Sequence, residues 1–153
     1  MSLRSSLEEH VFLQGLTGAQ ITRLASTGTA TEVTFDEDEV ILMDGQRSTF
    51  FYLIVAGSVA VELHTPGFAV CVQVLGPHQI FGWSALLGDQ DTLFRVRARE
   101  RTKVVRLSGA GLAEACRADP ELGAEVLRRA LRVVAGRVKA TELKFAEMCG
   151  VRI

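Results

Sequence analysis

From Thr29 to Leu107 the sequence is a succession of short runs rich in valine, isoleucine, phenylalanine and threonine, and this pattern limits the possible folds most strongly. Glycine or proline interrupts the runs about every eight to twelve residues, which is typical of an all-β barrel or sandwich. Asp44-Gly45 and Gly57-Ser58 place glycine where a turn needs a positive φ. The predicted strands are Thr29–Phe35, Val40–Met43, Phe50–Val55, Ser58–Leu63, Ala69–Leu75, Gln79–Phe81, Thr92–Arg99 and Lys103–Leu107.

Helical patterns flank the predicted strands. Apolar residues at helical spacing predict two short helices, over about residues 5 to 13 and 17 to 27, and Thr17 is a suitable N-cap for the second. We therefore expect one domain, made of N-terminal helices (1–28), a β-barrel (29–107) and C-terminal helices (108–153).

The C-terminal region predicts a short helix followed by a long one. Ser108 is a suitable N-cap for a helix that ends near Cys116. Asp119-Pro120 then reads as the N-cap and first position of a helix that runs to about Met148. Gly136 lowers the helix propensity by about 1 kcal/mol relative to alanine, which indicates either close packing or simple tolerance.

The composition excludes several classes of protein. A chain of 153 residues with 48% hydrophobic and 23% charged residues is globular, and a net charge of −1 gives no overall field for nucleic acid or membrane. No apolar run is long enough for a membrane span, and the N-terminus lacks the pattern of a signal peptide. We expect a soluble, cytoplasmic protein.

No pattern of reactive side chains predicts an enzyme, a metal site or a redox cofactor. The chain has no nucleophile elbow, no Walker loop and no paired carboxylates at catalytic spacing. The acidic run from Asp36 to Glu39 is interpreted as a solvated turn. The spacing of the cysteines and histidines favours neither a disulfide framework nor a metal, iron–sulfur or haem site. These residues are Cys71, Cys116, Cys149, His10, His64 and His78.

The segment Ile80-Phe81-Gly82-Trp83-Ser84-Ala85-Leu86-Leu87, followed by Thr92-Leu93-Phe94-Arg95, resembles the phosphate-binding cassette of cyclic nucleotide-binding domains. A second similar landmark is the aromatic and aliphatic run before Gly57-Ser58-Val59. The resemblance implies a double-stranded β-helix (jelly-roll) barrel with two short N-terminal helices and a long C-terminal helix. It also implies a small-molecule ligand, cyclic AMP or cyclic GMP, at the cassette.

Three positions of the cassette depart from the family pattern. Trp83 stands where the family has the glutamate that binds the ribose hydroxyl, and Thr92 stands where it has the arginine that neutralises the cyclic phosphate. Leu93 replaces a small residue. Loss of the arginine removes a charge-assisted contact that is worth about ten- to a hundredfold in affinity. The residues that the resemblance assigns to ligand binding are Phe81, Gly82, Trp83, Ser84, Ala85, Leu86, Thr92 and Leu93.

If the cassette binds an anion, a compensating cation must come from elsewhere in the chain. Strand alternation directs Thr92 and Phe94 inward, whereas Leu93, Arg95 and Arg97 point outward and form a solvated basic face with Arg99. The other candidates are Arg47, Arg132 and Arg137. Trp83 has two interpretations: it stacks on a planar ligand, or it fills the volume that a ligand would otherwise occupy.

The long helix carries two apolar stripes. Leu122, Val126, Ala130 and Val133 form one stripe, which is expected to face the barrel. The second is expected to pair with its twin in a homodimer, as in the family, although it could instead cover the barrel. This second stripe consists of Leu127, Leu131, Val134, Val138, Thr141, Phe145 and Met148.

Two hypotheses for the function follow. The first is a non-enzymatic sensor module that binds a nucleotide or another small anionic ligand at the cassette and shifts its long helix. The alternative is a homodimeric interaction scaffold whose pocket Trp83 closes. A DNA-binding regulator of the family's bacterial type needs a helix-turn-helix after the long helix, and we expect none in this chain.

Overall fold

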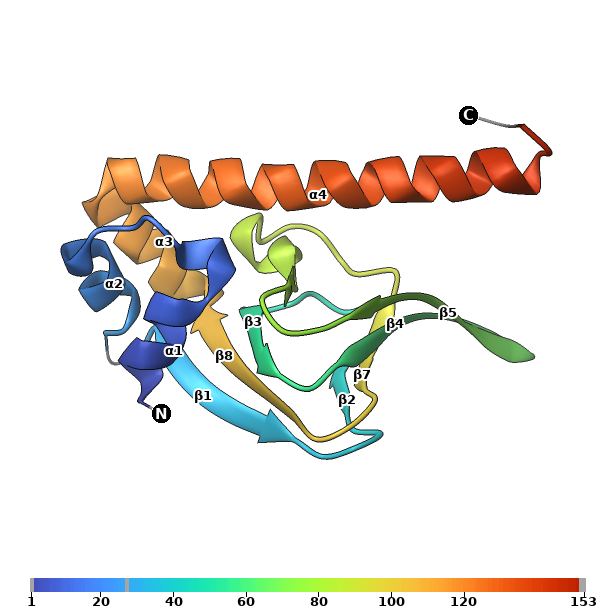
Figure 1. Cartoon of the computed structure of the whole chain (residues 1–153), viewed down its shortest axis with the longest axis horizontal. Coiled ribbons are helices and arrows are strands. Elements are labelled where there is room, and N and C mark those ends of the chain that lie inside the picture. The colour runs from blue at the N-terminus through green and yellow to red at the C-terminus, as the bar shows by residue number, and fades with distance from the viewer. Residues whose placement is uncertain (1, 27, 152–153) are drawn as a thin grey trace.

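The chain folds into two packed antiparallel sheets with helices on one side, as the computed structural model of residues 2–26 and 28–151 shows (Figure 1). The predicted mainly β fold with flanking helices and a long C-terminal helix is confirmed. The helices are α1 (Leu3–Glu9), η1 (Val11–Leu13), α2 (Gly18–Leu24), η2 (Trp83–Leu86), α3 (Gly109–Ala118) and α4 (Pro120–Met148). The strands are β1 (Ala30–Phe35), β2 (Val40–Leu42), β3 (Phe50–Ala56), β4 (Val59–Thr65), β5 (Phe68–Leu75), β6 (Ile80–Phe81), β7 (Arg95–Ala98) and β8 (Thr102–Ser108).

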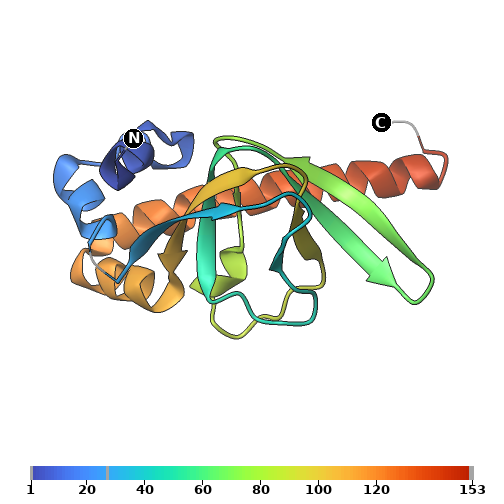
Figure 2. The same cartoon turned by 90° about the horizontal axis from the view of Figure 1, so that it is seen from below.

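The strands form two four-stranded sheets with the orders β1-β8-β3-β6 and β2-β7-β4-β5. Strands far apart in sequence are neighbours, since β1 pairs with β8 from Ala30↔Leu107 to Phe35↔Thr102. The β4–β5 hairpin, closed by the turn after Thr65, projects from the body of the sheets (Figure 2). The short β6 follows β5 and leads directly into η2, which places the cassette beside β3.

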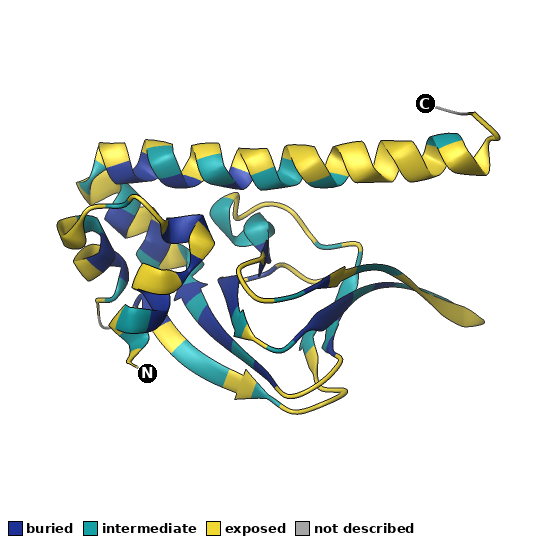
Figure 3. Cartoon of the chain, in the orientation of Figure 1, coloured by how far each residue is buried: buried dark blue, intermediate teal, exposed yellow. Residues whose placement is uncertain are grey.

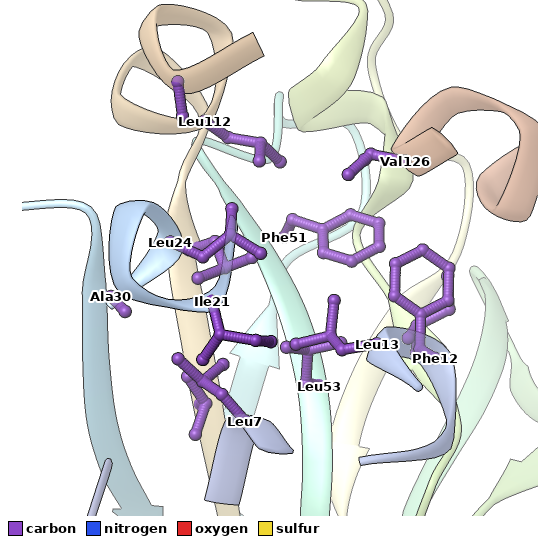
Figure 4. Packing of buried hydrophobic residues seen from close by; sticks show 14 of the residues in the cluster. Leu7, Phe12, Leu13, Ile21, Leu24, Ala30, Phe51, Leu53, Leu112 and Val126 are labelled. Carbon is purple, nitrogen blue, oxygen red and sulfur yellow. The ribbon is translucent and has the colours of Figure 1, made fainter. Parts of the chain in front are cut away.

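Two hydrophobic clusters stabilise this arrangement. One lies between the sheets and includes Tyr52, Val59, Leu75 and Phe81. The other joins the opposite face of the β3–β8 sheet to the helices, with Phe51 at 0% exposure near its centre (Figure 4). Burying one such side chain stabilises the fold by about 1.5 to 3 kcal/mol. Because many apolar side chains of the helices and the sheet are buried together in this second cluster, it is the main interaction that holds the helices on the sheet.

The helix starts agree with their sequence signals. The Thr17 side chain accepts from the Gln20 amide, and the Gln20 side chain accepts from the Thr17 amide, which completes a capping box. Ser108 caps α3, and Asp119 caps α4 with Pro120 at its first position. The predicted helix over residues 5 to 13 is wrong as one element, because His10 adopts extended backbone between α1 and η1. The predicted helix over 17 to 27 ends at Leu24, and residue 27 lies outside the described part of the chain.

The first half of the long helix α4 is partly buried against the body, and its second half is almost entirely exposed (Figures 1 and 3). Leu122, Val126 and Ala130 are buried, and Val133 packs against the same cluster, so the first stripe faces the barrel side as predicted. Most of the second stripe is solvent-exposed, with Leu131 at 68% and Phe145 at 67% exposure. The alternative in which this stripe covers the barrel is therefore excluded.

Candidate functional site: the cassette and the helix above it

The cassette turns sharply at Gly82. Its φ of +78° lies in the left-handed region, and a Cβ there would lie 2.7 Å from the Phe50 carbonyl oxygen. Only glycine fits both the conformation and the space. Of the other predicted binding residues, Phe81 is buried and its ring stacks on Tyr52 at 4.5 Å between centroids. The half-buried η2 residues are Trp83, Ser84, Ala85 and Leu86.

The segment from Thr92 to Phe94 is a loop, so the prediction that a strand begins at Thr92 is wrong. The Thr92 amide donates to the Gln46 carbonyl at 2.9 Å, and its carbonyl accepts from the Gly45 amide at 2.7 Å. These bonds tie it to the loop after β2, and β7 begins only at Arg95. The Thr92 hydroxyl donates to the Phe94 carbonyl at 3.0 Å, and Leu93 is 68% exposed. Neither residue replaces the missing cation.

The predicted basic face of β7 is also wrong, because its arginines are paired. Arg95 donates to Asp44 at 2.8 Å. Arg97 lies 2.6 Å from both Glu62 and Asp38, and its hydrogen bonds lower the pKa of Glu62 to about 2. Alternation does direct both arginines away from the interior, as predicted, since Val96 and Ala98 are buried.

Of the three candidate cations, Arg137 reaches the cassette. Arg47 is occupied in the loops, donating to the Gly88 carbonyl at 2.9 Å and to Asp91 at 3.3 Å, and Arg132 is exposed. Arg137 of α4 donates to the Ile80 carbonyl, and its guanidinium carbon lies 4.6 Å from the centre of the Trp83 ring. This cation–π contact joins α4 to the first residue of η2.

Arg137 is a desolvated cation. Burial between α4 and the barrel lowers its pKa to about 10. Within residues 2–26 and 28–151, no carboxylate lies within ion-pair distance of it. Arg129, two turns earlier on the same helix, pairs with Glu125 at 2.7 Å and donates to the Phe12 carbonyl. Arg137 therefore has the charge of Arg129 without its counter-ion.

The neighbours of Trp83 favour the interpretation in which its ring fills space. The half-buried ring packs against the cluster that joins the sheet to the helices, so it fills space beside the barrel. Arg137 covers one face of the ring, so a planar ligand can stack on that face only if the guanidinium moves. In the structure Trp83 therefore fills space, and a ligand could stack on its covered face only after Arg137 has moved.

Sequence reasoning missed a second half-buried arginine near the cassette. Arg106 of β8 lies with its guanidinium carbon 4.1 Å from the centre of the Phe50 ring, and its partner across the sheet is Tyr52. Burial raises the pKa of the Tyr52 hydroxyl. The available signal was a charged residue in a run of apolar ones, Lys103–Leu107, but alternation alone did not show which face it takes.

Residues 2–26 and 28–151 contain no group of three or more histidine, cysteine, aspartate or glutamate side chains placed to hold a metal ion. No helix among them has both the length and the apolar character that crossing a membrane requires.

Comparisons with known proteins agree with this geometry. The sequence model of the cyclic nucleotide-binding domain family matches residues 32–119. A protein from Geobacter metallireducens GS-15, described as a cyclic nucleotide-binding protein, superposes with a TM-score of 0.75 at 25% identity over 90% of this chain and 99% of that one. No curated protein sequence matches the chain.

Two further solved structures are regulatory subunits of a cAMP-independent protein kinase A. The one from Trypanosoma cruzi is bound to guanosine and has a TM-score of 0.73 at 19% identity, over 97% of this chain and 50% of that one. The one from Trypanosoma brucei is a mutant bound to cAMP in its A site, with a TM-score of 0.71 at 20% identity over 89% and 49%. In the mutant, a glutamate, a threonine seven residues later and the adjacent valine are replaced by alanine, arginine and alanine.

Proposed function

Because this chain belongs to the cyclic nucleotide-binding domain family, we propose that it is a non-enzymatic regulatory module that senses a planar ligand at the cassette and signals through α4. The ligand class that we propose is a purine nucleoside, not a cyclic nucleotide. The observation that carries the proposal is the contact between Arg137 of α4 and Trp83 of the cassette, because it links the two parts that a sensor must couple.

The residues of the cassette argue against a cyclic phosphate. Thr92 stands at the position of the phosphate-binding arginine, and its hydroxyl is already bonded to the Phe94 carbonyl. A neutral nucleoside does not need that cation. It keeps the planar base that Trp83 can stack on, which is worth about 1 to 3 kcal/mol for an aromatic side chain and a base.

The two trypanosome proteins support this ligand class. This chain has Ala85 seven residues before Thr92, with Leu93 next to it. At the spacing of the three replaced residues, Thr92 matches the threonine and Leu93 is similar to the valine of the unmutated kinase subunit, whereas Ala85 matches the alanine of the mutant. The mutant that was bound to cAMP carries arginine and alanine there, and the related T. cruzi protein was bound to guanosine.

The contact between Trp83 and Arg137 gives the proposed sensor its coupling. In this proposal the base stacks on the face of Trp83 that Arg137 covers, and so displaces the guanidinium. Arg137 also holds the Ile80 carbonyl, so its displacement weakens two links between α4 and the barrel side. Ligand binding thereby favours a different position of α4.

The test is calorimetric titration of the purified protein with guanosine, adenosine, cAMP and cGMP, with Trp83 fluorescence measured in parallel. We expect the nucleosides to bind more tightly than the cyclic nucleotides and to change the fluorescence. The variant Thr92→Arg with Leu93→Ala should gain at least about tenfold in cAMP affinity, because it restores the charge-assisted contact. Arg99→Lys, at an exposed position directly after β7, is the control.

Two results would contradict this proposal. Micromolar binding of cAMP by the unaltered protein would show that another cation holds the phosphate. If neither nucleosides nor cyclic nucleotides bind at any soluble concentration, the remaining hypothesis is the scaffold whose pocket is closed by Trp83.

A second function, homodimerisation through α4, is favoured by the exposed stripe. Leu127, Leu131, Val138 and Phe145 are 50 to 68% exposed, and the structure describes nothing that covers them. Contiguous exposed apolar surface of this kind marks an interaction site, and a helix with apolar residues at alternating spacings of four and three pairs well with a second copy of itself.

Multi-angle light scattering tests the dimer. Leu131→Glu with Val138→Glu should give folded monomers, because it places charges in the centre of the stripe. Arg132→Glu with Lys139→Glu is the matched control, since these exposed positions lie next to the stripe but not in it. A monomeric unaltered protein would exclude the dimer.

A further inference from the structure

A hollow of about 330 Å³ lies beneath α4 and meets the cassette only at its first residue, Ile80. Three separate parts of the chain line it and leave it open to solvent on one side: η1, the segment from Gln73 to Ile80, and α4 around Gly136. Its apolar lining comes from Val11, Phe12, Ile80 and Val133. This volume is at the lower end of the range for small-molecule pockets.

The polar lining of the hollow contains donors and no acid. Gln73, Gln79 and His78 line it together with Arg137. Nδ1 of His78 accepts from the Val11 amide at 3.4 Å, which leaves the Nε2–H of the neutral ring as a donor. His10 lies behind it with a ring-centroid distance of 5.5 Å and adds no negative charge. The electrostatic character of the lining is therefore positive.

Arg137 has donors to spare in this hollow. Of the five N–H groups of its guanidinium, one bonds to the Ile80 carbonyl, and no further hydrogen bond from it is found within the described part of the chain. A half-buried cation without a counter-ion is unfavourable unless an anion reaches it. The apolar surroundings make such an anion more strongly bound than it would be at an exposed arginine.

Gly136 opens the α4 side of the hollow. A Cβ built on it has no heavy atom within 4 Å, so the glycine is not there for close packing against the barrel. Glycine lowers the stability of a helix more than any other residue except proline. A side chain at this position would project into the hollow, because Gly136 is part of its lining.

We propose that this hollow is a second binding site, distinct from the cassette, for a small carboxylate with an apolar body. Arg137 binds the carboxylate, the amides of Gln73 and Gln79 donate to it, and the apolar lining packs against the body. The site does not depend on the nucleoside proposal, although Arg137 borders both sites.

The test is an NMR titration of the ¹⁵N-labelled protein with benzoate, with benzamide as the uncharged probe of the same shape. We expect saturable shifts at His78, Gln79 and Gly136, and weaker binding of benzamide by at least about tenfold. Gly136→Leu fills the hollow and should lower the benzoate affinity by at least about tenfold. Ala135→Leu is its matched control, because it adds the same side chain to the exposed face of α4.

Arg137→Met should also lower the affinity for benzoate by about tenfold or more while leaving that for benzamide unchanged. The proposal is wrong if benzoate shows no saturable shifts, if the shifts centre on Gly82 to Leu86, or if Gly136→Leu binds benzoate as the unaltered protein does. A protein that binds benzoate but no nucleoside keeps this site and refutes the cassette proposal. The reverse result refutes this site alone.

Discussion

Replacing Arg137 by methionine should leave the free energy of unfolding within about 1 kcal/mol of the unaltered protein, although the side chain is half-buried and makes two contacts. A free guanidinium has a pKa above about 12, and burial lowers that of Arg137 to about 10. At neutral pH this difference corresponds to about 3 kcal/mol against the charged side chain in the folded state.

The contacts of Arg137 offset most of that cost. The hydrogen bond from a charged group to the Ile80 carbonyl is worth about 1.5 to 3 kcal/mol. The cation–π contact with Trp83 adds about 1 to 2 kcal/mol in a desolvated setting. Methionine keeps much of the apolar stem and removes the charge, so the favourable and unfavourable effects nearly cancel.

Arg129→Met is the control for this prediction, because Arg129 lies on the same helix but has a counter-ion. Arg129 has Glu125 as counter-ion and donates to the Phe12 carbonyl at 2.6 Å, so its replacement removes two favourable interactions without relieving an unpaired charge. We expect it to lower the free energy of unfolding by about 2 kcal/mol. Urea unfolding followed by far-ultraviolet circular dichroism at one protein concentration measures both variants. A decrease above about 2 kcal/mol for Arg137→Met, equal to or larger than that for Arg129→Met, would refute the reasoning.

Three further changes test the fold. The pKa of buried His10 is lowered to about 4, chiefly by burial, so the unfolded chain takes up the proton first as pH falls from about 6.5. The free energy of unfolding should therefore decrease by up to about 3 kcal/mol between about pH 6.5 and pH 4. His10→Gln should reduce this pH dependence when it is measured by urea unfolding. Gly57→Ala should destabilise by about 1 to 3 kcal/mol, because its φ is +91° and a Cβ would lie 2.5 Å from the Thr102 hydroxyl; Gly67→Ala, in open space, should change the urea midpoint little. Phe51→Ala should cost about 3 to 5 kcal/mol in calorimetric or urea unfolding, and a decrease below about 1 kcal/mol would contradict its central place in the cluster.

The strands and the helix caps could be predicted because their signals are local. Asp119 and Pro120 begin α4, and Gly45 and Gly57 take the positive φ values that their turns require. Within β7, Val96 and Ala98 are buried and Arg95 and Arg97 point outward, as alternation predicts. The pairing of β1 with β8 had no local signal, since strand order depends on interactions across the whole segment.

The failures concern residues whose environment is set by distant partners. Arg95 and Arg97 looked like a solvated face, but their carboxylate partners Asp44, Asp38 and Glu62 come from other strands and loops. Thr92 was placed in a strand, whereas its backbone bonds to the loop at Gly45 and Gln46 instead. The alternation of residues along a strand gives no information about such contacts with distant segments.

Arg137 could be named as a candidate cation from the sequence, but its role could not. On α4 it lies 54 residues after Trp83, and only the packing of the helix over the barrel brings the two together. Gly136 was likewise ambiguous, because a glycine in a helix is compatible both with close packing and with open space beside it. The structure separates these possibilities by placing open space beside it.

The position of Arg137 between the cassette and the hollow has a thermodynamic consequence for the two proposed sites. A base that stacks on Trp83 displaces the guanidinium from the ring, which lets the guanidinium move toward a carboxylate in the hollow. A carboxylate in the hollow draws the same guanidinium away from Trp83, which uncovers the face that the base needs. Each ligand therefore breaks the cation–π interaction that opposes the other, and linkage requires that the increase in affinity be the same in both directions. Since this interaction is worth about 1 to 2 kcal/mol, the coupling should be roughly five- to thirtyfold, and it should vanish in Arg137→Met.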